Sequence, residues 1–443
     1  MNNMKLKPYP KYKDSGIEWI GEIPGGWEVR KLKTISKIVL GKMLANDDKG
    51  NYLLKPYLRA QNIFWENVDV SDIKEMWFSP TEIKIYRLSK NDLLVSEGGE
   101  VGRTAIWSEE IDECYIQNSV HKVIISPERN PRYFLYVFET FGLLGYFESI
   151  VNRVSIGHLT REKLKEVNCI VPPHSDQTAI ANFLDRKIAK GNSLIEKNTK
   201  LIELLKERRT ALINHAVTKG IDSNAKLKDS GIEWIGEIPE GWEVDKLKRF
   251  CKKITDGSHI SPETTNEGKY YITVTDVKQD EIDFNNAHFI SENDFESLKR
   301  NGCQPNITDV LLTKDGTIGR CVVVKNNDFV ALSSLGIITP EDNLKSEYLR
   351  YYLVSDKNIK QMFSHIRGSA LTRLTISLIK ELIIIKPPKP EQTKIVQYLD
   401  KATAKIDKTI QKIEEKVNLL EEFKKSLINH VVTGKVDVRR GKV

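Results

Sequence analysis

Two glycine-rich segments, each ending in an arginine, are the best candidates for chemistry in this sequence. They read Gly98-Gly-Glu-Val-Gly-Arg103 and Asp315-Gly-Thr-Ile-Gly-Arg320. Glycines let a loop bring its backbone N–H groups close to a phosphate, and an arginine can form two hydrogen bonds with O6 and N7 of guanine. These segments therefore predict contact with nucleic acid. A tight hairpin whose arginine forms a salt bridge is a second interpretation that the residues leave open.

Polar residues on or just after short predicted strands extend this set of candidates. Arg59, Gln61 and Asn62 lie in one such segment, and Thr273 and Thr275 lie in its counterpart in the second half of the chain. Because side chains alternate along a strand, several of them can face the same way. The candidate DNA-binding residues are Lys42, Arg59, Gln61, Asn62, Gly99, Arg103, Asp256, His259, Thr273, Thr275, Lys278, Lys314 and Arg320.

Motifs for catalysis are missing from the sequence. It has no Gly-rich strand-to-helix loop suited to S-adenosylmethionine and no G-x-x-x-x-G-K-[ST] for ATP. The Pro-Pro pairs at 172–173 and 387–388 lack the preceding asparagine of the N-P-P-aromatic motif of amino-methyltransferases, and Glu82-Ile-Lys84 lacks the Pro-Asp of a nuclease motif. The five cysteines form no C-x-x-C pair. We therefore expect no catalytic residue, bound cofactor or metal in this chain.

The candidate segments belong to a unit that occurs twice in the chain. Residues 13–33 and 228–248 are identical except for Gly25 against Glu240 and Arg30 against Asp245, and their separation is 228 − 13 = 215. The intervals 34–153 and 249–368 have nearly equal lengths but mostly different sequences. Two copies are too few for a solenoid. The pattern therefore predicts a pseudo-dimer in one polypeptide, with a shared frame and two different specificities.

Each repeat ends in a long amphipathic helix. Apolar residues recur at steps of three and four from about 176 to 218 and again in the matching part of the second repeat. At a rise of 1.5 Å per residue, such a helix is about 65 Å long, which is too long for an ordinary globular domain. We therefore expect the two helices to pack against each other. Gly191 would leave room for a close approach or a bend.

The variable intervals have the pattern of mixed α/β domains. Short β-branched segments such as 57–63, 92–96, 120–125 and 310–313 predict strands, and 131–147 and 346–363 predict helices. The predicted organisation is an N-terminal arm at 1–24, a variable domain at 25–172, a long helix with linker at 173–227, a second variable domain at 228–387 and a second long helix at 388–443.

Bulk properties fit a soluble cytoplasmic protein. The 443 residues carry a formal net charge of +7, which permits a polyanionic partner without requiring one. The sequence starts without the apolar segment of a secretory signal, and no run approaches the roughly 18 apolar residues of a membrane span. We expect no membrane association.

Four repeated motifs together resemble the specificity subunit of type I restriction-modification systems over essentially the whole chain. They are Trp-Ile-Gly-Glu-Ile-Pro-x-Gly-Trp, the Pro-Pro-x-x-x-Gln-Thr that opens each long helix, the Leu-Ile-Asn-His-x-Val-Thr that closes it, and the Gly-x-x-Gly-Arg segments. The resemblance implies two pseudo-symmetric target-recognition domains separated by two conserved antiparallel helices, which form a coiled-coil-like spacer.

The resemblance also implies a function. Each recognition domain would read one half of a bipartite, asymmetric site in double-stranded DNA, and the spacer would set the gap between the halves. The implied partners are two modification (methyltransferase) subunits and the restriction (helicase-nuclease) subunits. S-adenosylmethionine, ATP and Mg would then bind to those partners, and this chain would be a non-catalytic part of the endonuclease complex.

A two-headed scaffold that binds other proteins without DNA specificity is the alternative. Such a scaffold would lack an affinity for duplex DNA that falls steeply with salt. The paired tryptophans, Trp19 with Trp27 and Trp234 with Trp242, could stack on bases, but we expect them to lie in the core. The basic residues of the long helices could lie in solvent, contact phosphates or contact a methyltransferase subunit.

Overall fold

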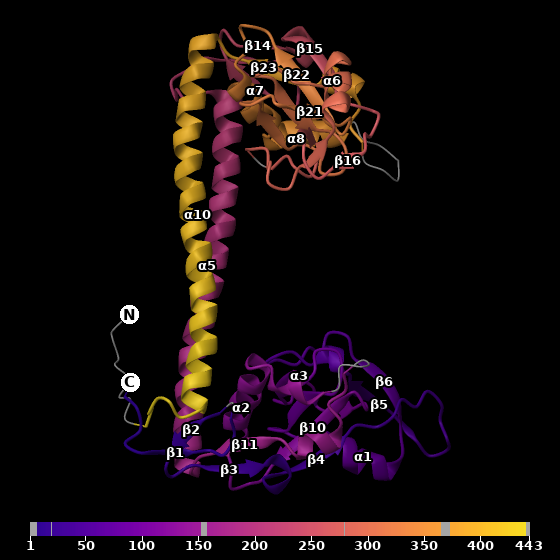
Figure 1. Cartoon of the computed structure of the whole chain (residues 1–443), viewed down its shortest axis with the longest axis vertical. Coiled ribbons are helices and arrows are strands. Elements are labelled where there is room, and N and C mark those ends of the chain that lie inside the picture. The colour runs from indigo at the N-terminus through magenta and orange to yellow at the C-terminus, as the bar shows by residue number, and fades with distance from the viewer. Residues whose placement is uncertain (1–6, 19, 152–156, 279, 365–372, 440–443) are drawn as a thin grey trace. The chain divides into compact units, whose positions relative to one another are not determined.

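The chain divides into two compact units in a computed structural model that describes residues 7–18, 20–151, 157–278, 280–364 and 373–439. Unit 1 contains residues 1–198 and 415–443, and unit 2 contains residues 199–414. Each predicted variable domain falls within one unit, whereas each long helix contributes one part to each unit. Figure 1 shows the helices and strands of both units.

The two long predicted helices are present as α5 (His174–Lys219) and α10 (Lys389–Val432). In unit 1 the first part of α5 lies beside the second part of α10, where Lys424 Nζ is 3.3 Å from Asn192 Oδ1. In unit 2 the second part of α5 lies beside the first part of α10, where Arg209 Nε donates to Asp407 at 2.9 Å. The two helices are therefore antiparallel, as the resemblance implied. A Cβ on Gly191 would meet no atom within 4 Å, so the predicted close approach at this residue is wrong.

Unit 1 combines two main sheets with short helices. A four-stranded antiparallel sheet has the order β4-β10-β7-β8, and a three-stranded sheet has the order β6-β5-β9. Its strands are β1 (Tyr12–Asp14), β2 (Glu22–Pro24), β3 (Glu28–Lys31), β4 (Ser36–Leu40), β5 (Leu53–Leu58), β6 (Lys74–Phe78), β7 (Leu93–Ser96), β8 (Thr104–Ile106), β9 (Tyr115–Ile116), β10 (Val120–Ile125) and β11 (Asn168–Val171). Its shorter helices are η1 (Leu32–Thr34), η2 (Ala60–Asn62), α1 (Pro80–Tyr86), α2 (Pro131–Leu143), α3 (Tyr146–Ile150) and α4 (Arg161–Lys165).

Unit 2 repeats this topology. Its main sheets have the orders β15-β22-β19-β20 and β16-β18-β17-β21, and the parallel pair β17–β21 matches the parallel pair β5–β9 of unit 1. The strands are β12 (Leu227–Asp229), β13 (Glu237–Pro239), β14 (Glu243–Lys246), β15 (Cys251–Asp256), β16 (Thr264–Thr265), β17 (Lys269–Ile272), β18 (His288–Ile290), β19 (Val310–Thr313), β20 (Cys321–Val323), β21 (Phe329–Ala331), β22 (Leu335–Pro340) and β23 (Ile383–Lys386). The shorter helices are η3 (Leu247–Arg249), α6 (Glu292–Arg300), α7 (Ser346–Leu353), α8 (Asp356–Ser364) and α9 (Ile376–Glu381). The mixed α/β fold class of both variable domains is confirmed.

One predicted strand ends earlier than expected, and two predicted helices are each divided in two. The strand predicted over 57–63 stops at Leu58, and η2 follows. The helix predicted over 131–147 is divided into α2 and α3 because Gly145 adopts a left-handed φ of 67°. The helix predicted over 346–363 is divided into α7 and α8, with Ser355 Oγ donating to the carbonyl oxygen of Tyr352 at 2.6 Å.

The repeated glutamine at the start of each long helix joins three segments. In unit 1, Gln177 Nε2 donates to the carbonyl oxygen of Pro172 at 2.8 Å, and its Oε1 accepts from the backbone N–H of Asn130 at 2.9 Å. In unit 2, Gln392 makes the same pair of bonds, to Pro387 at 2.8 Å and from Lys345 at 2.7 Å. The motif therefore fixes the helix start against the strand before it and against the helix packed on it.

Buried tyrosines fix the variable domains to the long helices. Tyr136 of α2 donates to Asp185 of α5 at 2.5 Å, and Tyr351 of α7 donates to Asp400 of α10 at 2.6 Å. The two bonds occupy matching positions, since 351 − 136 = 215 and 400 − 185 = 215. A buried hydroxyl needs a partner, so each bond selects one position of the domain along its helix.

The prediction of core tryptophans is confirmed for Trp27 and Trp242 and wrong for Trp234. Trp27 and Trp242 are each 1% exposed, and their indole N–H groups donate to Asp176 at 3.4 Å and to Glu391 at 2.9 Å. Trp234 is 40% exposed, so the core prediction is wrong for this residue. Trp19 lies outside the described residues.

The cysteines lie in the cores as free thiols. Four are buried and Cys251 is half-buried. Burial raises the pKa of Cys114, Cys251 and Cys321 to about 12, so these thiols stay protonated at neutral pH.

Within the described part of the chain, no helix is long and apolar enough to cross a membrane.

The N-terminal arm completes unit 1 at the end of α10. Lys435 Nζ, just after α10, donates to the carbonyl oxygen of Glu22 in β2 at 2.7 Å. In unit 2 the equivalent bond runs from Lys219, at the end of α5, to the carbonyl oxygen of Glu237 in β13 at 2.5 Å. Unit 1 therefore combines residues from both ends of the sequence, whereas unit 2 forms from one continuous segment, residues 199–414.

This closure makes Gly434 sensitive to substitution. Its φ is +73°, and a Cβ there would collide with the ring of Pro24 and approach Trp27. We expect Gly434→Ala to lower the free energy of unfolding by about 2–4 kcal/mol, from a strained backbone and an overpacked contact. Gly16→Ala is the control, because its φ is +72° with no atom within 4 Å, and it should lose only the backbone share, about 1–2 kcal/mol. Equal losses in urea unfolding would show that the arm does not pack on α10.

One acid of unit 1 is buried where α2 faces α10. Glu139 is 7% exposed, and its Oε2 has no hydrogen-bond partner among the described groups. Burial, with Glu66 as the next cause, raises its pKa to about 8, while Lys424 and Arg132 oppose the shift. It lines a cavity of about 510 Å³ together with Trp65, Glu66, Glu100, Val101, Gly142, Leu143, Phe147, Glu148, Glu421, Lys424 and Lys425.

The raised pKa predicts a pH-dependent stability. The folded state holds the Glu139 proton more tightly than the unfolded chain, whose value is 4.5, so its effect on stability becomes less favourable as pH rises from about 4.5 to about 8. The side chain in Glu139→Gln carries no charge at any pH. The free energy of unfolding of this variant, relative to that of the unmodified protein, should therefore increase across this range, by at least about 1 kcal/mol at pH 8. Thermal unfolding at several pH values measures the gain. The exposed Glu148→Gln, which lines the same cavity, is the control, and a matching pH dependence there would contradict the assignment.

Candidate nucleic-acid interface

Four turns of unit 1 meet at the ends of β4, β5, β7 and β10. They cover residues 41–44, 59–62, 97–103 and 117–119, and we call them turn cluster 1. The carbonyl oxygen of Lys42 accepts from Asn118 at 2.9 Å, and Ser119 binds the backbone N–H groups of Ala60 at 3.0 Å and Glu97 at 2.9 Å. The hydrogen bonds therefore join segments far apart in sequence into one surface.

Unit 2 builds the same arrangement from residues 257–260, 273–278, 314–320 and 332–334, which we call turn cluster 2. Ser333 donates its N–H to the carbonyl oxygen of Ser258 at 2.8 Å, and Lys314 donates its N–H to Ser334 at 2.9 Å. The first turn of each cluster depends on a glycine. A Cβ on Gly257 would collide with the carbonyl group of Ala331, as one on Gly41 would with that of Gln117.

The two motif arginines hold each hairpin against the neighbouring turn. Arg103 Nη2 donates to the carbonyl oxygen of Ala60 at 3.2 Å, and Arg320 Nη1 donates to that of Val277 at 3.2 Å. Arg103 also lies 3.8 Å from Glu100, so the salt bridge of the second interpretation is present in unit 1. Its Nε is buried without a hydrogen-bond partner in the described structure. Each arginine therefore has a structural bond and lies within its turn cluster.

The glycines of the two motifs have separate roles. A Cβ on Gly102 would collide with Phe147 of α3, and one on Gly319 would collide with Ile359 of α8. These second glycines therefore allow a helix to pack on the hairpin. Gly99 and Gly316 have φ values of 73° and 66° with no atom within 4 Å of a Cβ, so the backbone at the first glycines is open to a partner.

The polar candidates of the 59–62 turn are brought together by one acid. Arg59 Nη2 donates to Asp72 at 2.8 Å, and Gln61 Nε2 donates to the same carboxylate at 3.3 Å. The hydrogen bond from Arg59 lowers the pKa of Asp72, which stays ionised. Asn62 is buried, and its side chain accepts from the backbone N–H of Arg59 and donates to Asp69. Gln61 thus remains exposed, Arg59 is only partly exposed, and Asn62 shapes the turn.

The matching turn of unit 2 is organised by Asp276. Its Oδ2 accepts from the N–H and the hydroxyl of Thr273, both at 2.8 Å. The Thr275 hydroxyl lies 2.8 Å from that of Thr273, and Lys278 Nζ donates to the carbonyl oxygen of Thr275 at 2.8 Å. Lys278 keeps 47% side-chain exposure and lies 3.9 Å from Asp283, so its ammonium group can still reach a partner.

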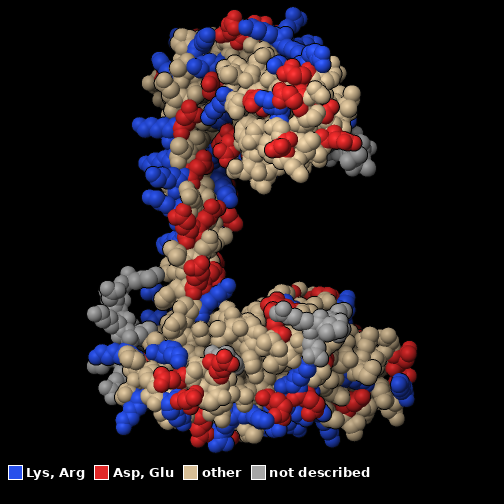
Figure 2. Space-filling view, in the orientation of Figure 1, with Lys and Arg blue, Asp and Glu red and all other residues tan. Residues whose placement is uncertain are grey.

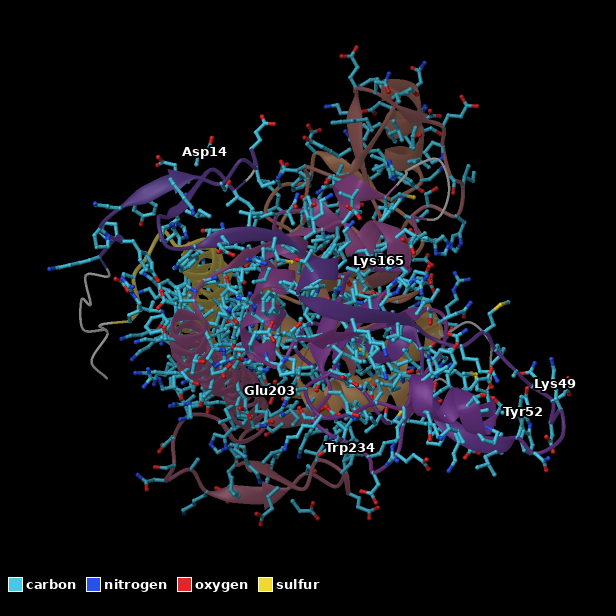
Figure 3. All side chains as sticks on the ribbon, turned by 90° about the horizontal axis from the view of Figure 1, so that it is seen from below. Asp14, Lys49, Tyr52, Lys165, Glu203 and Trp234 are labelled. Carbon is cyan, nitrogen blue, oxygen red and sulfur yellow. The ribbon has the colours of Figure 1, made fainter. Side chains whose placement is uncertain are left out.

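Two of the candidate lysines are buried and paired. Lys42 Nζ donates to Glu82 at 2.5 Å and lies between the rings of Tyr52 and Phe78. Figure 3 labels Tyr52, with Lys49, on the loop that follows Lys42. The Lys314 side chain is 1% exposed and lies 3.4 Å from Asp256 and 3.6 Å from Asp315. Both ammonium groups therefore neutralise acids beneath the turn clusters. His259, by contrast, is 65% exposed and 3.1 Å from Asp256.

Some exposed residues of these surfaces were not among the sequence candidates. Met43 and Leu44 are 75% and 52% exposed in turn cluster 1, and Ile260 is 69% exposed in turn cluster 2. Arg373, half-exposed, reaches turn cluster 2 and lies 3.1 Å from Asp315. Aligning Gly41 with Gly257 after the first long strand would have found the apolar residues. Apolar side chains at such positions suit the methyl group of thymine.

Charge alone does not mark the interface. Figure 2 shows acidic and basic side chains interspersed on the visible face of each unit. Base reading by hydrogen bonds needs mixed donors and acceptors, whereas phosphate contacts need cations. The turn clusters offer both kinds of group on two similar frameworks, which fits a bipartite reader of nucleic acid.

Comparison with known proteins gives the class to which this framework belongs. The model of the type I restriction modification DNA specificity domain matches the chain twice, over residues 24–204 and 239–419. The chain therefore belongs to this family. A proposed MjaX type I restriction enzyme specificity subunit of Methanocaldococcus jannaschii is 27% identical, with 95% of this chain and 96% of that protein covered.

Other relatives agree. The EcoKI type I restriction enzyme specificity subunit of Escherichia coli K12 is 22% identical over 88% of this chain and 85% of its own length. A chain from a structural study of type I restriction-modification complex assembly has a TM-score of 0.70 at 15% identity, covering 93% of this chain and 98% of that chain. The HsdS subunit of Thermoanaerobacter tengcongensis has a TM-score of 0.55 at 15% identity, covering 94% and 98%. The fold is shared along almost the whole chain.

The arginine of each hairpin is the first residue to test. Arg103→Ala should relax discrimination in one half of the recognised sequence by about 1–3 kcal/mol if the contact with guanine is bidentate, and Arg320→Ala should do so in the other half. Methylation of DNA with single base changes in either half, by the assembled complex, measures this. A loss that is equal for all sequences would instead assign the arginine to a phosphate.

Proposed function

We propose that this chain is the DNA sequence-recognition subunit of a type I restriction-modification complex, in which each recognition domain reads one half of a bipartite, asymmetric site. The observation that carries the proposal is the pair of turn clusters. In both clusters the backbone carbonyl of one serine, Ser119 or Ser334, accepts from the hairpin, and the motif arginine binds a carbonyl oxygen of the 59–62 or 273–278 turn, while the side chains that the clusters expose differ. A shared framework with different exposed groups suits two unlike half-sites.

The spacer and the partners extend this proposal. Two methyltransferase subunits dock on the chain, and helicase-nuclease subunits join them. S-adenosylmethionine, ATP and Mg bind to those partners, and this chain, a non-catalytic component, supplies the sequence choice. The helices α5 and α10 run through both units without interruption, which supports a role for them in setting the gap between the half-sites.

Exchange of one variable interval tests the proposal. Replacing residues 34–153 by the matching interval of another family member should change one half of the methylated sequence and leave the other half intact, because each unit contains its own turn cluster. Exchange of residues 249–368 is the matched control and should change only the other half. Sequencing of methylated adenines in cells that contain the whole complex gives the result.

Two outcomes would contradict it. A change in both halves after one exchange would show that the domains do not read independently. A complex whose affinity for duplex DNA is absent or insensitive to salt would favour the two-headed protein scaffold, since phosphate contacts make affinity fall steeply with salt.

A further inference from the structure

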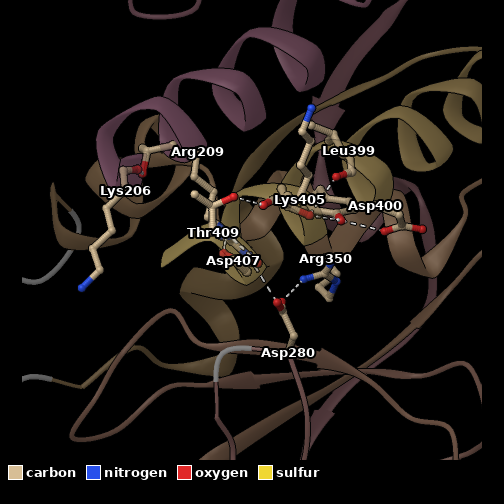
Figure 4. Close-up of polar contacts among 12 residues, drawn as sticks. Lys206, Arg209, Asp280, Arg350, Leu399, Asp400, Lys405, Asp407 and Thr409 are labelled. Carbon is tan, nitrogen blue, oxygen red and sulfur yellow. Dashed lines mark hydrogen bonds and ion pairs between the residues drawn. The ribbon is translucent and has the colours of Figure 1, made fainter. Parts of the chain in front are cut away.

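A cation on a long helix binds the recognition domain in unit 2. Arg209 of α5 donates through Nε to Asp407 of α10 at 2.9 Å and through Nη2 to Asp280 of the domain at 3.2 Å. Asp280 also accepts from Arg350 of α7. Figure 4 shows Asp280 between the two arginines. The Arg209 side chain is 11% exposed, so one mostly buried guanidinium connects both long helices with the domain.

Unit 1 contains the same arrangement at matching positions. Lys424 of α10 lies 3.3 Å from Asn192 of α5 and 4.0 Å from Glu66 of the recognition domain. These residues correspond to the cation, the helix partner and the domain acid of unit 2, since 424 − 209 = 215, 407 − 192 = 215 and 280 − 66 = 214. The arrangement recurs although none of its three residues is the same.

Both acids lie next to the turns at 59–62 and 273–278, which belong to turn clusters 1 and 2 and are called the base-reading turns below. Glu66 lies in a turn closed by the bridge between Ile63 and Val68, and this turn directly follows η2. Asp280 lies in the matching turn, closed by the bridge between Val277 and Ile282. The carbonyl oxygen of Val277 is the one that Arg320 binds. A cation that holds the acid therefore holds the segment that presents the candidate base contacts.

We propose that Arg209 and Lys424 are equivalent positioning residues, each of which fixes the angle at which its helix pair presents a base-reading turn to DNA. The inference rests on the proposed function. A reading turn held at one angle reaches its half-site at one gap length, so these cations restrict the gap that the complex accepts. Neither cation needs to touch DNA to do so.

The two arrangements differ in strength. In unit 2, Asp280 accepts hydrogen bonds from two arginines. In unit 1, Lys424 lies 4.0 Å from Glu66, and the buried Glu139 of α2 is a second acid beside Glu66. A guanidinium forms directed bonds to two acids at once, which an ammonium group does less well. Loss of Arg209 should therefore have the larger effect.

The test uses the whole complex with its methyltransferase subunits and a set of duplexes. All duplexes carry the recognised half-sites, and the gap is native, one base pair shorter or one base pair longer. In Arg209→Ala, the methylation rate on the native gap relative to the altered gaps should fall about three-fold or more, the size expected for an ion pair of moderate strength. Lys424→Ala should show a smaller fall, and Arg209→Lys should restore part of the preference.

Matched controls separate positioning from stability. Arg208→Ala and Lys425→Ala remove exposed neighbouring cations of the same helices and should leave the gap preference unchanged, whatever their effect on the overall rate. Asp280→Asn removes the charge of the domain acid, whose side chain is 46% exposed, and should change the gap preference as Arg209→Ala does. The inference is overturned if Arg209→Ala lowers the methylation rate equally on every gap. It is also overturned if Arg209→Ala keeps the same gap preference as Arg208→Ala. Failure of the proposed function itself shows earlier, because the unmodified complex would then methylate no bipartite site.

Discussion

A helix of more than forty residues has to cover an apolar stripe along its whole length, and the rest of this structure follows from that requirement. The helices α5 and α10 pack against each other in antiparallel fashion, and the recognition domains cover further apolar residues near their ends, whereas Leu204 and Leu419 stay exposed. Ile180 and Leu184 share a core with Ile428 in unit 1, as Ile213 shares one with Ile395 and Leu399 in unit 2. Neither a helix nor a domain could bury its apolar surface alone.

The anchors between domain and helix explain why the repeat has remained recognisable. Each anchor is a buried residue that binds a polar group of another element: Tyr136 and Tyr351, Gln177 and Gln392, and Trp27 and Trp242. A buried polar group without its partner costs more than the bond contributes, so these positions tolerate little change. In the turn clusters several side chains, among them Met43, Leu44 and Ile260, are exposed to solvent and are free of this constraint. The chain can thus keep its frame and still differ at the exposed positions of the turn clusters.

Sequence patterns predicted what depends on local periodicity. The long helices, the strands at 120–125 and 310–313 and the shared fold of the two domains follow from spacing and alignment. Features that depend on distant partners escaped: Lys42 is buried because Glu82 and two aromatic rings surround it, and Trp234 is exposed although its neighbour Ile235 is buried. The break at Gly145 needed its left-handed backbone, which sequence alone does not reveal. Arg373 joins its turn cluster through Asp315, a contact between residues 58 positions apart (373 − 315 = 58).

The assembly of unit 1 from both ends of the sequence imposes an order on its folding during synthesis. Residues 199–414 form unit 2 and are made before residues 415–443, which supply Ile428 and Val431 to the core of unit 1. At about 5–20 residues per second, the ribosome needs roughly 10–40 s to add those intervening residues. During that time the core of unit 1 lacks the residues that α10 contributes, and Trp27 is among the residues left uncovered. The domain that is begun first is therefore completed last, and a chain that ended at residue 414 would lose part of the core of its first domain while keeping all the residues of unit 2.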